Sequence, residues 1–443
     1  MKRYISTLKF KPVMAFLAII LMLPACEIDD IPDPNNPTVE SVLVNATVDD
    51  LNNLVVGTEA GMRTFLATYY DDMGVIGREH YRFSSADPRF TADLLGKGSS
   101  VLDDNTFYTT NPWAGRYRVV KNTNILIASA NNTTLISDEE REGYLGFAET
   151  IKAHQLLLNL TMMYEPGIRL DVDDPDNLGP FVEREAALDS IALLLDEGAG
   201  HIAAAGEEFP FTLSEGFEGF NDPAGFLQFN RALAARVAVY REEFGEALTL
   251  LEGSFLDLST DFNKGVYYTF SASSGDLLNP VFVAPNSSGE IRIAHPSYIS
   301  DIAPNDDRIS KVLLRDEAAS LDNLTGKYDV AVYKSNTDPI PIIRNEELIL
   351  IYAEANIQTG NTLEAVKALN IIRQGHGVGP YVGLVTKEAL IDEMLYQRRY
   401  SLYFEGHRWV DLRRYNRLDE LPIDRPGDDV WTSFPKPFIE QAF

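Results

Sequence analysis

The stretch from Glu388 to Arg414 combines apolar residues at helical spacing with many charged residues between them. Its main apolar positions recur at intervals of four or seven residues: Ile391, Leu395, Leu402 and Trp409. This spacing places them on one face of a helix, so the pattern predicts one long amphipathic helix in which Trp409 is buried. Glu405 is expected to bond one of the arginines one or two helical turns away. Gly406 would weaken the helix by about 1 kcal/mol unless a neighbouring backbone needs the room.

Two shorter helical patterns come directly before this stretch. The first runs from Asn345 to Thr359, and Gly360 can end it in a left-handed conformation. Asn361 and Glu364 have the spacing of a capping box, which predicts that a second helix begins there. Because so short a turn forces antiparallel packing, the two form a predicted αα-hairpin of the tetratricopeptide type.

Helical spacing also covers much of the chain before residue 261. The predicted helices span about 39–70 (one or two helices), 113–130, 137–164, 185–205 and 224–252. Asn111-Pro112 favours a turn just before the second of these ranges, and Ser137 with Glu140 forms a capping box that opens the third. Repeated helical pairs of this kind predict a tetratricopeptide-like stack.

Two segments, residues 71–112 and 262–343, lack helical spacing. The first carries four glycines, two prolines and many aromatic residues. The second contains strand-like runs at Val266–Phe270 and Pro280–Val283 between turn-forming residues. The predicted fold class is therefore mainly α: a tetratricopeptide-like helical-pair stack with an irregular, loop-rich lobe that contains a few short strands.

Three runs in the C-terminal part of the chain resemble a known family. They are RNEELILIYAEAN, GNTLEAVKALNIIR and EALIDEMLYQRRYSLYFEGHRWVDLRR. Together they resemble the C-terminal region of the SusD/RagB family, the surface lipoproteins of Bacteroidetes that work with TonB-dependent transporters. The resemblance is specific in the last hundred residues and weaker over the rest.

This resemblance implies a SusD-like domain over residues 39–443. Its helical stack would comprise about 39–261 and 344–443, and the segments 71–112 and 262–343 would carry the ligand surface. The implied partner is a SusC-like TonB-dependent transporter of the outer membrane. The ligand would be captured without catalysis.

The N-terminal 26 residues have the pattern of a lipoprotein signal. Positive residues come first, and the apolar run Val13–Leu23 is far shorter than the roughly 20 residues that span a bilayer. Cys26 follows Ala25 at the end of this run, so residues 1–25 are predicted to be removed and Cys26 to be lipidated. It is the single cysteine, which excludes intramolecular disulfides.

The residues after Cys26 are predicted to form a tether. Residues 26–38 are acidic and Pro-rich, which favours an extended chain. Their early acidic residues resemble the signal that sends Bacteroidetes lipoproteins to the outer leaflet. We therefore expect an outer-membrane protein that faces the cell exterior and is attached through lipid alone.

The chain is strongly acidic, with 66 Asp and Glu against 38 Lys and Arg, a formal net charge of −28. Nucleic acid is an unlikely class of partner, because neutralising phosphates requires a basic surface and the chain has no basic run after residue 25. The acidity by itself indicates little more than a soluble, exposed surface.

No motif in the sequence nominates an enzyme or a resident cofactor. HExxH, Walker A, GxSxG and dinucleotide fingerprints are all missing from the sequence. Asp171–Asn177 begins like a calcium loop, but Pro175 occupies the fifth position and fails the EF-hand pattern. A calcium site of another type among these acids stays open. Carboxylate pairs carry no signal, because the chain is so acidic throughout.

Aromatic and polar residues alternate in the run Arg78–Phe90, and this run is the main candidate for ligand binding. Aromatic rings offer flat faces to the C–H groups of sugars, and arginine can bond hydroxyls. The residues selected as ligand-binding are Arg78, Tyr81, Phe83 and Trp113, with Tyr298 from the second loop-rich segment. Tyr81 and Phe83 are expected to be exposed stacking rings, although each ring could instead anchor the core.

The preferred function is a non-catalytic surface lipoprotein that captures oligosaccharide and delivers it to the transporter. Capture of peptides is the nearest alternative. Two alternatives of other classes stay open: a surface-anchored glycan hydrolase and a structural helical-repeat scaffold.

Overall fold

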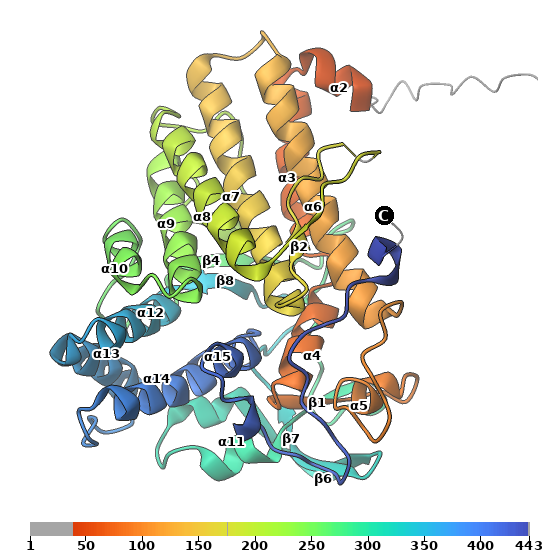
Figure 1. Cartoon of the computed structure of the whole chain (residues 1–443), viewed down its shortest axis with the longest axis vertical. Helices are drawn as coiled ribbons and strands as arrows, with labels where there is room; N and C mark the ends of the chain where they lie inside the picture. Colours follow the sequence, from red (N-terminus) through yellow and green to blue (C-terminus); the bar gives the residue numbers. More distant parts are fainter. Residues whose placement is uncertain (1–38, 175, 442–443) are drawn as a thin grey trace, which may run out of the picture.

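The computed structural model describes residues 39–174 and 176–441. The predicted signal peptide, Cys26, the tether and Pro175 therefore lie outside the described residues. Helices dominate this part of the chain, and strands β1 (His80–Phe83), β6 (Val312–Leu321) and β7 (Leu324–Val330) lie at one end of the molecule (Figure 1). The predicted mainly α fold class, a helical stack with a few short strands, is confirmed.

The helices form one continuous stack in which neighbours along the chain pack side by side (Figure 1). The N-terminal part comprises α2 (Val39–Asn45), α3 (Val48–Met62), α4 (Leu66–Ile76), α6 (Phe107–Asn132), α7 (Asp138–Met163), α8 (Arg184–Ala203), α9 (Pro223–Tyr240) and α10 (Phe244–Glu252). The C-terminal part comprises α12 (Asn345–Gln358), α13 (Thr362–Gly375), α14 (Lys387–Ser401) and α15 (Arg408–Arg414). Helix α10 packs on α12, so the two parts of the stack join across the intervening loop-rich residues.

Local sequence signals explain some of the helix ends. Ser137 accepts a hydrogen bond from the backbone of Glu140, and the Glu140 side chain accepts one from Ser137, as the capping box predicts. Gly360 has φ +84°, which confirms the predicted left-handed end of α12. The capping box predicted at Asn361 is wrong, because its side chain caps no backbone group of α13.

Two predicted helix boundaries are also wrong. The range 224–252 holds two helices, since the chain turns between α9 and α10 at Glu242, which has φ +62°. Helix α6 begins at Phe107, so Pro112 lies buried inside it rather than in a turn before it. Packing against the core outweighs the local preference of proline in this helix.

The two loop-rich segments meet in a four-stranded antiparallel sheet. Its strand order is β1 (His80–Phe83), β5 (Ile291–Ala294), β7 (Leu324–Val330) and β6 (Val312–Leu321). Tyr81 lies opposite Ile293, so strand β1 from the early segment is paired directly with a strand of the later segment. Ligand surfaces built on the two segments would therefore be close together.

Two small ribbons complete the strand structure of the described residues. Strand β4 (Gly265–Tyr268) pairs with β8 (Ile340–Arg344), and β2 (Ile168–Arg169) pairs with β3 (Phe181–Val182). The strand predicted at Pro280–Val283 is absent. The backbone N–H groups of Val281 and Phe282 instead donate to the Asn279 side chain at 2.9 and 3.2 Å, which fixes a turn.

The single long helix predicted over 388–414 is wrong, because the chain breaks between Ser401 and Arg408. Phe404 has φ +66° and Gly406 has φ +80°, and neither is a helical conformation. Glycine adopts positive φ without strain, which explains the residue at this break. The turn carries the Phe404 ring into the core, where its centroid lies 4.8 Å from that of His80.

The C-terminal segment (residues 415–441) runs from α15 back across the molecule to α6 (Figure 1). Trp409 Nε1–H donates to the carbonyl of Trp431 at 2.8 Å, which holds the middle of the segment. Near its end, Trp113 Nε1–H donates to Glu440 Oε1 at 3.0 Å. The segment therefore connects both halves of the helical stack.

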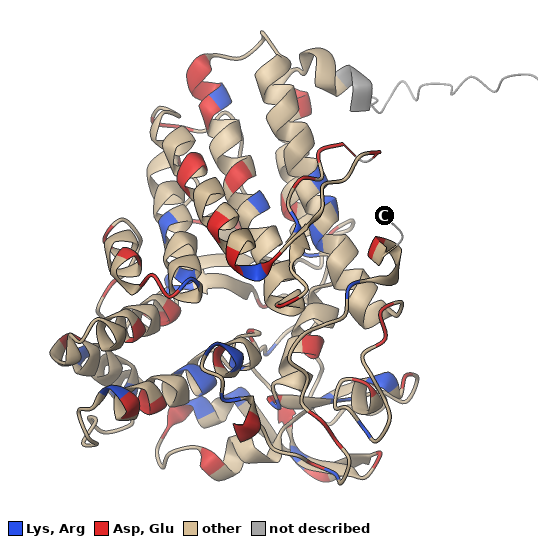
Figure 2. Cartoon of the chain, viewed as in Figure 1, with Lys and Arg blue, Asp and Glu red and all other residues tan. Residues whose placement is uncertain are grey.

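Buried ion pairs hold several of the charges on and around the C-terminal helices. Figure 2 shows lysine and arginine gathered along α14 and α15. The buried pairs include Arg236–Glu347 at 2.6 Å, Arg344–Glu405 at 2.8 Å and Arg398–Asp411 at 2.6 Å. The predicted bond of Glu405 to an arginine one or two turns away is wrong, because its partner Arg344 is the last residue of β8, 61 positions earlier in the sequence.

Candidate functional site

All five residues predicted to bind ligand are buried. Each of them exposes at most 3% of its surface. They are Arg78, Tyr81, Phe83, Trp113 and Tyr298. The predicted exposure of the Tyr81 and Phe83 rings is therefore wrong, and the contacts of all five indicate structural roles.

Arg78 and Trp113 hold the C-terminal segment. The Arg78 guanidinium donates to the carbonyls of Pro422 at 3.2 Å and Asp429 at 2.7 Å. The Trp113 indole stacks on Phe181 with centroids 5.8 Å apart, in addition to its hydrogen bond with Glu440. Pro422 lies 344 positions after Arg78, and Glu440 lies 327 positions after Trp113. The sequence around Arg78 and Trp113 therefore gives no sign of these partners.

Tyr81, Phe83 and Tyr298 anchor the sheet and its neighbours. Tyr81 stacks on Phe83 with centroids 5.7 Å apart, and burial together with the charge of Asp424 raises the pKa of its hydroxyl. Tyr298 donates to the carbonyl of Arg308 at 2.8 Å from the short helix α11 (Pro296–Asp301). Rings fixed in this way cannot stack on a ligand without local unfolding.

A partly exposed aromatic pair does lie in the early loop-rich segment. Phe90 comes from the short helix α5 (Arg89–Ala92), and Phe107 is the first residue of α6. Their ring centroids lie 5.2 Å apart in an edge-to-face arrangement. The guanidinium of Arg82 lies 5.3 Å from the centre of the Phe90 ring, and that of Arg89 lies 4.9 Å from the centre of the Phe107 ring. We call this feature the Phe90–Phe107 surface.

Two carboxylates flank the Phe90–Phe107 surface. Asp87 accepts from the Arg89 guanidinium at 2.6 and 2.9 Å, and these bonds lower its pKa. Glu290, from the turn before β5, accepts from Arg82 at 2.8 Å and from Ser84 at 2.7 Å. Burial alone would raise the pKa of Glu290, but these two contacts outweigh burial and lower it. Both groups are therefore ionised at neutral pH and can accept hydrogen bonds.

This combination of groups suits a polyhydroxylated ligand. Aromatic rings contact the apolar faces of a sugar, whereas guanidinium donors and carboxylate acceptors bond its hydroxyl groups. Phe90 stands in the run singled out from the sequence, but neither it nor Phe107 was selected. Partial exposure depends on packing that the sequence pattern does not reveal.

The described residues 39–174 and 176–441 contain no group of three or more His, Cys, Asp or Glu side chains placed to hold a metal ion. The predicted alternative of a calcium site near Asp171 includes Pro175, which lies outside them. None of the helices in this part of the chain is long and apolar enough to cross a membrane.

Comparisons with known proteins agree on one family. Residues 325–433 match the model of the SusD family. A SusD-like protein of Formosa agariphila is 36% identical over 104 residues, a match that spans 21% of this chain and 21% of that protein. A SusD superfamily protein from Bacteroides vulgatus has the same fold, with a TM-score of 0.68 and 16% identity over 89% of this chain and 96% of its own. The sequence similarity to the SusD family is thus confined to the C-terminal quarter of the chain, and the structural similarity shows that the chain has the SusD fold.

A further SusD-fold structure was solved with a ligand. Surface glycan-binding protein A from Bacteroides thetaiotaomicron, in complex with laminarihexaose, has a TM-score of 0.68 and 14% identity. The similarity covers 89% of this chain and 97% of that chain. At this identity the likeness shows the SusD fold, and it does not transfer individual ligand contacts.

Proposed function

We propose that this SusD-fold protein is a non-catalytic binding protein of the cell surface that captures oligosaccharide. The observation that carries the proposal is the shared fold with a glycan-binding protein whose structure contains laminarihexaose. The Phe90–Phe107 surface supports it, because rings, arginines and carboxylates from the two loop-rich segments lie together there. We take this surface as the site of capture.

The proposal includes the location and the partner. Residues 1–25 would be the signal peptide, Cys26 the lipidated residue and residues 26–38 the tether that carries the SusD-like domain outside the outer membrane. The captured oligosaccharide would pass to a SusC-like TonB-dependent transporter. The similarity of residues 325–433 to the SusD family and the sequence pattern before residue 39 support these parts of the proposal.

Binding measurements with a glycan panel that includes laminarihexaose test the proposal. Calorimetry should give saturable binding to at least one oligosaccharide. Phe90→Ala and Phe107→Ala should each weaken it at least tenfold, about 1.4 kcal/mol, because a stacking ring at the centre of an interface carries much of the binding energy.

Phe244→Ala provides a matched control, because Phe244 is also partly buried and is also the first residue of a helix, α10. It should leave the affinity unchanged. Saturable binding only to peptides would overturn the oligosaccharide assignment. Release of shorter sugars from a bound oligosaccharide would overturn the non-catalytic assignment. Equal effects of all three variants would move the site away from the Phe90–Phe107 surface.

A further inference from the structure

A cavity of about 350 Å³ lies between α11, α14, α15 and the short 3-10 helix η3 (Leu418–Glu420), away from the Phe90–Phe107 surface. Small-molecule sites are usually about 300–1,000 Å³, so this volume suits a small ligand. Leu395, Leu412 and Pro422 supply apolar wall. No residue of the Phe90–Phe107 surface lines it.

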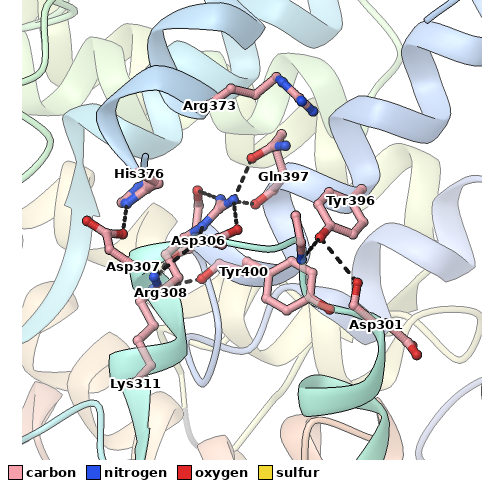
Figure 3. A network of polar contacts seen from close by, with 12 residues as sticks. Asp301, Asp306, Asp307, Arg308, Lys311, Arg373, His376, Tyr396, Gln397 and Tyr400 are labelled. Carbon is pink, nitrogen blue, oxygen red and sulfur yellow. Dashed lines mark hydrogen bonds and ion pairs between the residues drawn. The ribbon is translucent and has the colours of Figure 1, made fainter. Parts of the chain in front are cut away.

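The wall on the α11 side is held firmly. Tyr396 points from α14 toward Asp301 (Figure 3), and its hydroxyl donates to the Asp301 carbonyl at 3.2 Å and accepts from the backbone N–H of Ala303 at 2.7 Å. Next to it, Arg308 donates to the Gln397 side chain at 2.7 Å (Figure 3). This bond holds the turn that follows α11 against α14. The cavity is therefore preformed rather than dependent on a mobile wall.

Each carboxylate that lines the cavity already has an arginine partner. Asp301 lies 2.9 Å from Arg399, and Asp392 lies 2.6 Å from Arg417. Arg417 also pairs with Glu420. The remaining one, Asp411, is held by Arg398 at 2.6 Å and Arg414 at 2.9 Å. These acids are thus neutralised within the protein, and none needs a bound cation.

Arg408 is the lining cation without such a partner. Within residues 39–174 and 176–441 its guanidinium forms no ion pair, and its buried Nε has no hydrogen-bond partner. Burial and the neighbouring charge of Arg399 lower its pKa to about 9, so it is still charged at neutral pH. Glu79 is the carboxyl that most favours this charge, but burial raises its pKa to about 8. Glu79 forms no ion pair with Arg408 within the described residues, and its Oε1 accepts instead from the backbone N–H of Phe404 at 3.3 Å.

We propose that this cavity binds a ligand with a carboxylate and a body of about one sugar ring, with Arg408 as the counter-ion of the carboxylate. An isolated charge in a low-dielectric site is unfavourable, and a carboxylate that pairs with the guanidinium fork removes that cost. The leucine and proline side chains then contact the body of the ligand. The site goes beyond oligosaccharide capture at the Phe90–Phe107 surface and does not depend on it.

A shallower hollow of about 570 Å³ continues from this cavity. The two share Asp392, Arg417 and Glu420, so the ion-paired Arg417 lies at their boundary. A ligand longer than one ring can therefore place its carboxylate at Arg408 and extend outward. This geometry fits the end of an acidic chain, either an oligosaccharide that ends in a uronic acid or the C-terminus of a peptide.

Calorimetry with three small probes tests whether this cavity binds a carboxylate. D-glucuronate carries both a sugar ring and a carboxylate, N-acetyl-leucine carries the carboxylate alone, and D-glucose carries the ring alone. We expect a carboxylate probe to bind and Arg408→Gln to weaken it at least tenfold. Lys367→Gln makes the same charge change at an exposed site on α13 and should leave the affinity unchanged.

Two further measurements keep the test decisive. Arg408→Gln should melt no lower than the parent, because an unpaired buried charge has been removed. If it fails to fold, Arg408→Lys keeps the charge but loses the planar fork, and should bind with intermediate affinity. Binding by glucuronate only would identify a sugar acid, and binding by N-acetyl-leucine would identify a peptide end. Equal binding of glucose and glucuronate, no carboxylate binding up to about 10 mM, or unchanged binding by Arg408→Gln would overturn the proposal.

Discussion

Replacing Trp409 should destabilise the protein strongly without changing ligand binding. Its ring is fully buried at the start of α15, packs edge-on against Phe434 with centroids 6.0 Å apart, and donates its indole N–H to the carbonyl of Trp431 at 2.8 Å. The Arg413 guanidinium lies 4.2 Å from the ring centre. Trp409 thus joins α15, the C-terminal segment and a buried cation.

The magnitude follows from these contacts. Removal of a buried tryptophan side chain costs about 3–5 kcal/mol through lost burial and the cavity that remains. The Trp431 carbonyl would also lose its donor, which adds about 1–3 kcal/mol if no water replaces it. Burial lowers the pKa of Arg413 to about 9, and loss of the ring leaves its charge with the Tyr164 ring at 3.9 Å as its remaining close aromatic partner. We expect about 4–8 kcal/mol for Trp409→Ala.

Trp409→Phe separates these contributions, because it keeps most of the ring but lacks the indole N–H. It should cost about 2–3 kcal/mol, roughly half of the alanine effect or less. Urea unfolding followed by circular dichroism gives both values, and calorimetry with the glycan bound by the parent checks function. If Trp409→Ala unfolds at the same urea concentration as the parent but no longer binds, the assignment of Trp409 to the core is refuted.

Three further predictions concern charges and the anchor. Glu405→Ala should lower the free energy of unfolding by about 1–3 kcal/mol, as measured by thermal melts. This is less than the cost of leaving the Arg344 charge without any partner, because Arg344 keeps a second carboxylate partner. A loss above about 5 kcal/mol would contradict this prediction. Burial alone would raise the pKa of Glu347, but the Arg236 charge lowers it. The stability that this ion pair contributes is therefore complete above about pH 4.3, the pKa of a glutamate in the unfolded chain, and is lost as the pH falls below that value. Glu347→Gln should therefore cost about 3–5 kcal/mol at pH 7 and clearly less at pH 3, and equal costs at both pH values would refute the coupling. Cys26→Ala should release a folded protein from the membrane fraction, because the apolar run before it is too short to span a bilayer, and a variant that stays firmly bound would disprove the lipid anchor.

Helices with clear local signals could be predicted from the sequence, whereas breaks fixed by distant contacts could not. The hairpin of α12 and α13 follows from apolar spacing and Gly360, and both signals lie within a few residues of the turn. The break before α15 depends on Phe404, which takes positive φ so that its ring reaches the core beside residues of α4 and β1. Apolar spacing continues across this break, so the spacing alone indicates one helix.

The candidate site was predictable as a region but not residue by residue. The early loop-rich segment does carry the partly exposed Phe90 and Phe107, yet Tyr81 in the same run is buried against a strand 212 positions further along the chain, with Ile293 opposite it. Alternating aromatic and polar residues look alike in both cases. Which ring is covered depends on the later strands and the C-terminal segment, and that information is absent from the run itself.

The C-terminal segment has a consequence for how the protein is made. The Arg78 guanidinium binds the carbonyl of Asp429, a separation of 351 positions, so this contact cannot form until residue 429 has been synthesised. Such distant pairings carry a large loop-closure entropy and slow the final step of folding. A polypeptide that terminates early near residue 420 would expose the indole N–H groups of Trp113 and Trp409 and their apolar surroundings. Loss of the residues after 420 would therefore yield an incompletely closed, aggregation-prone product.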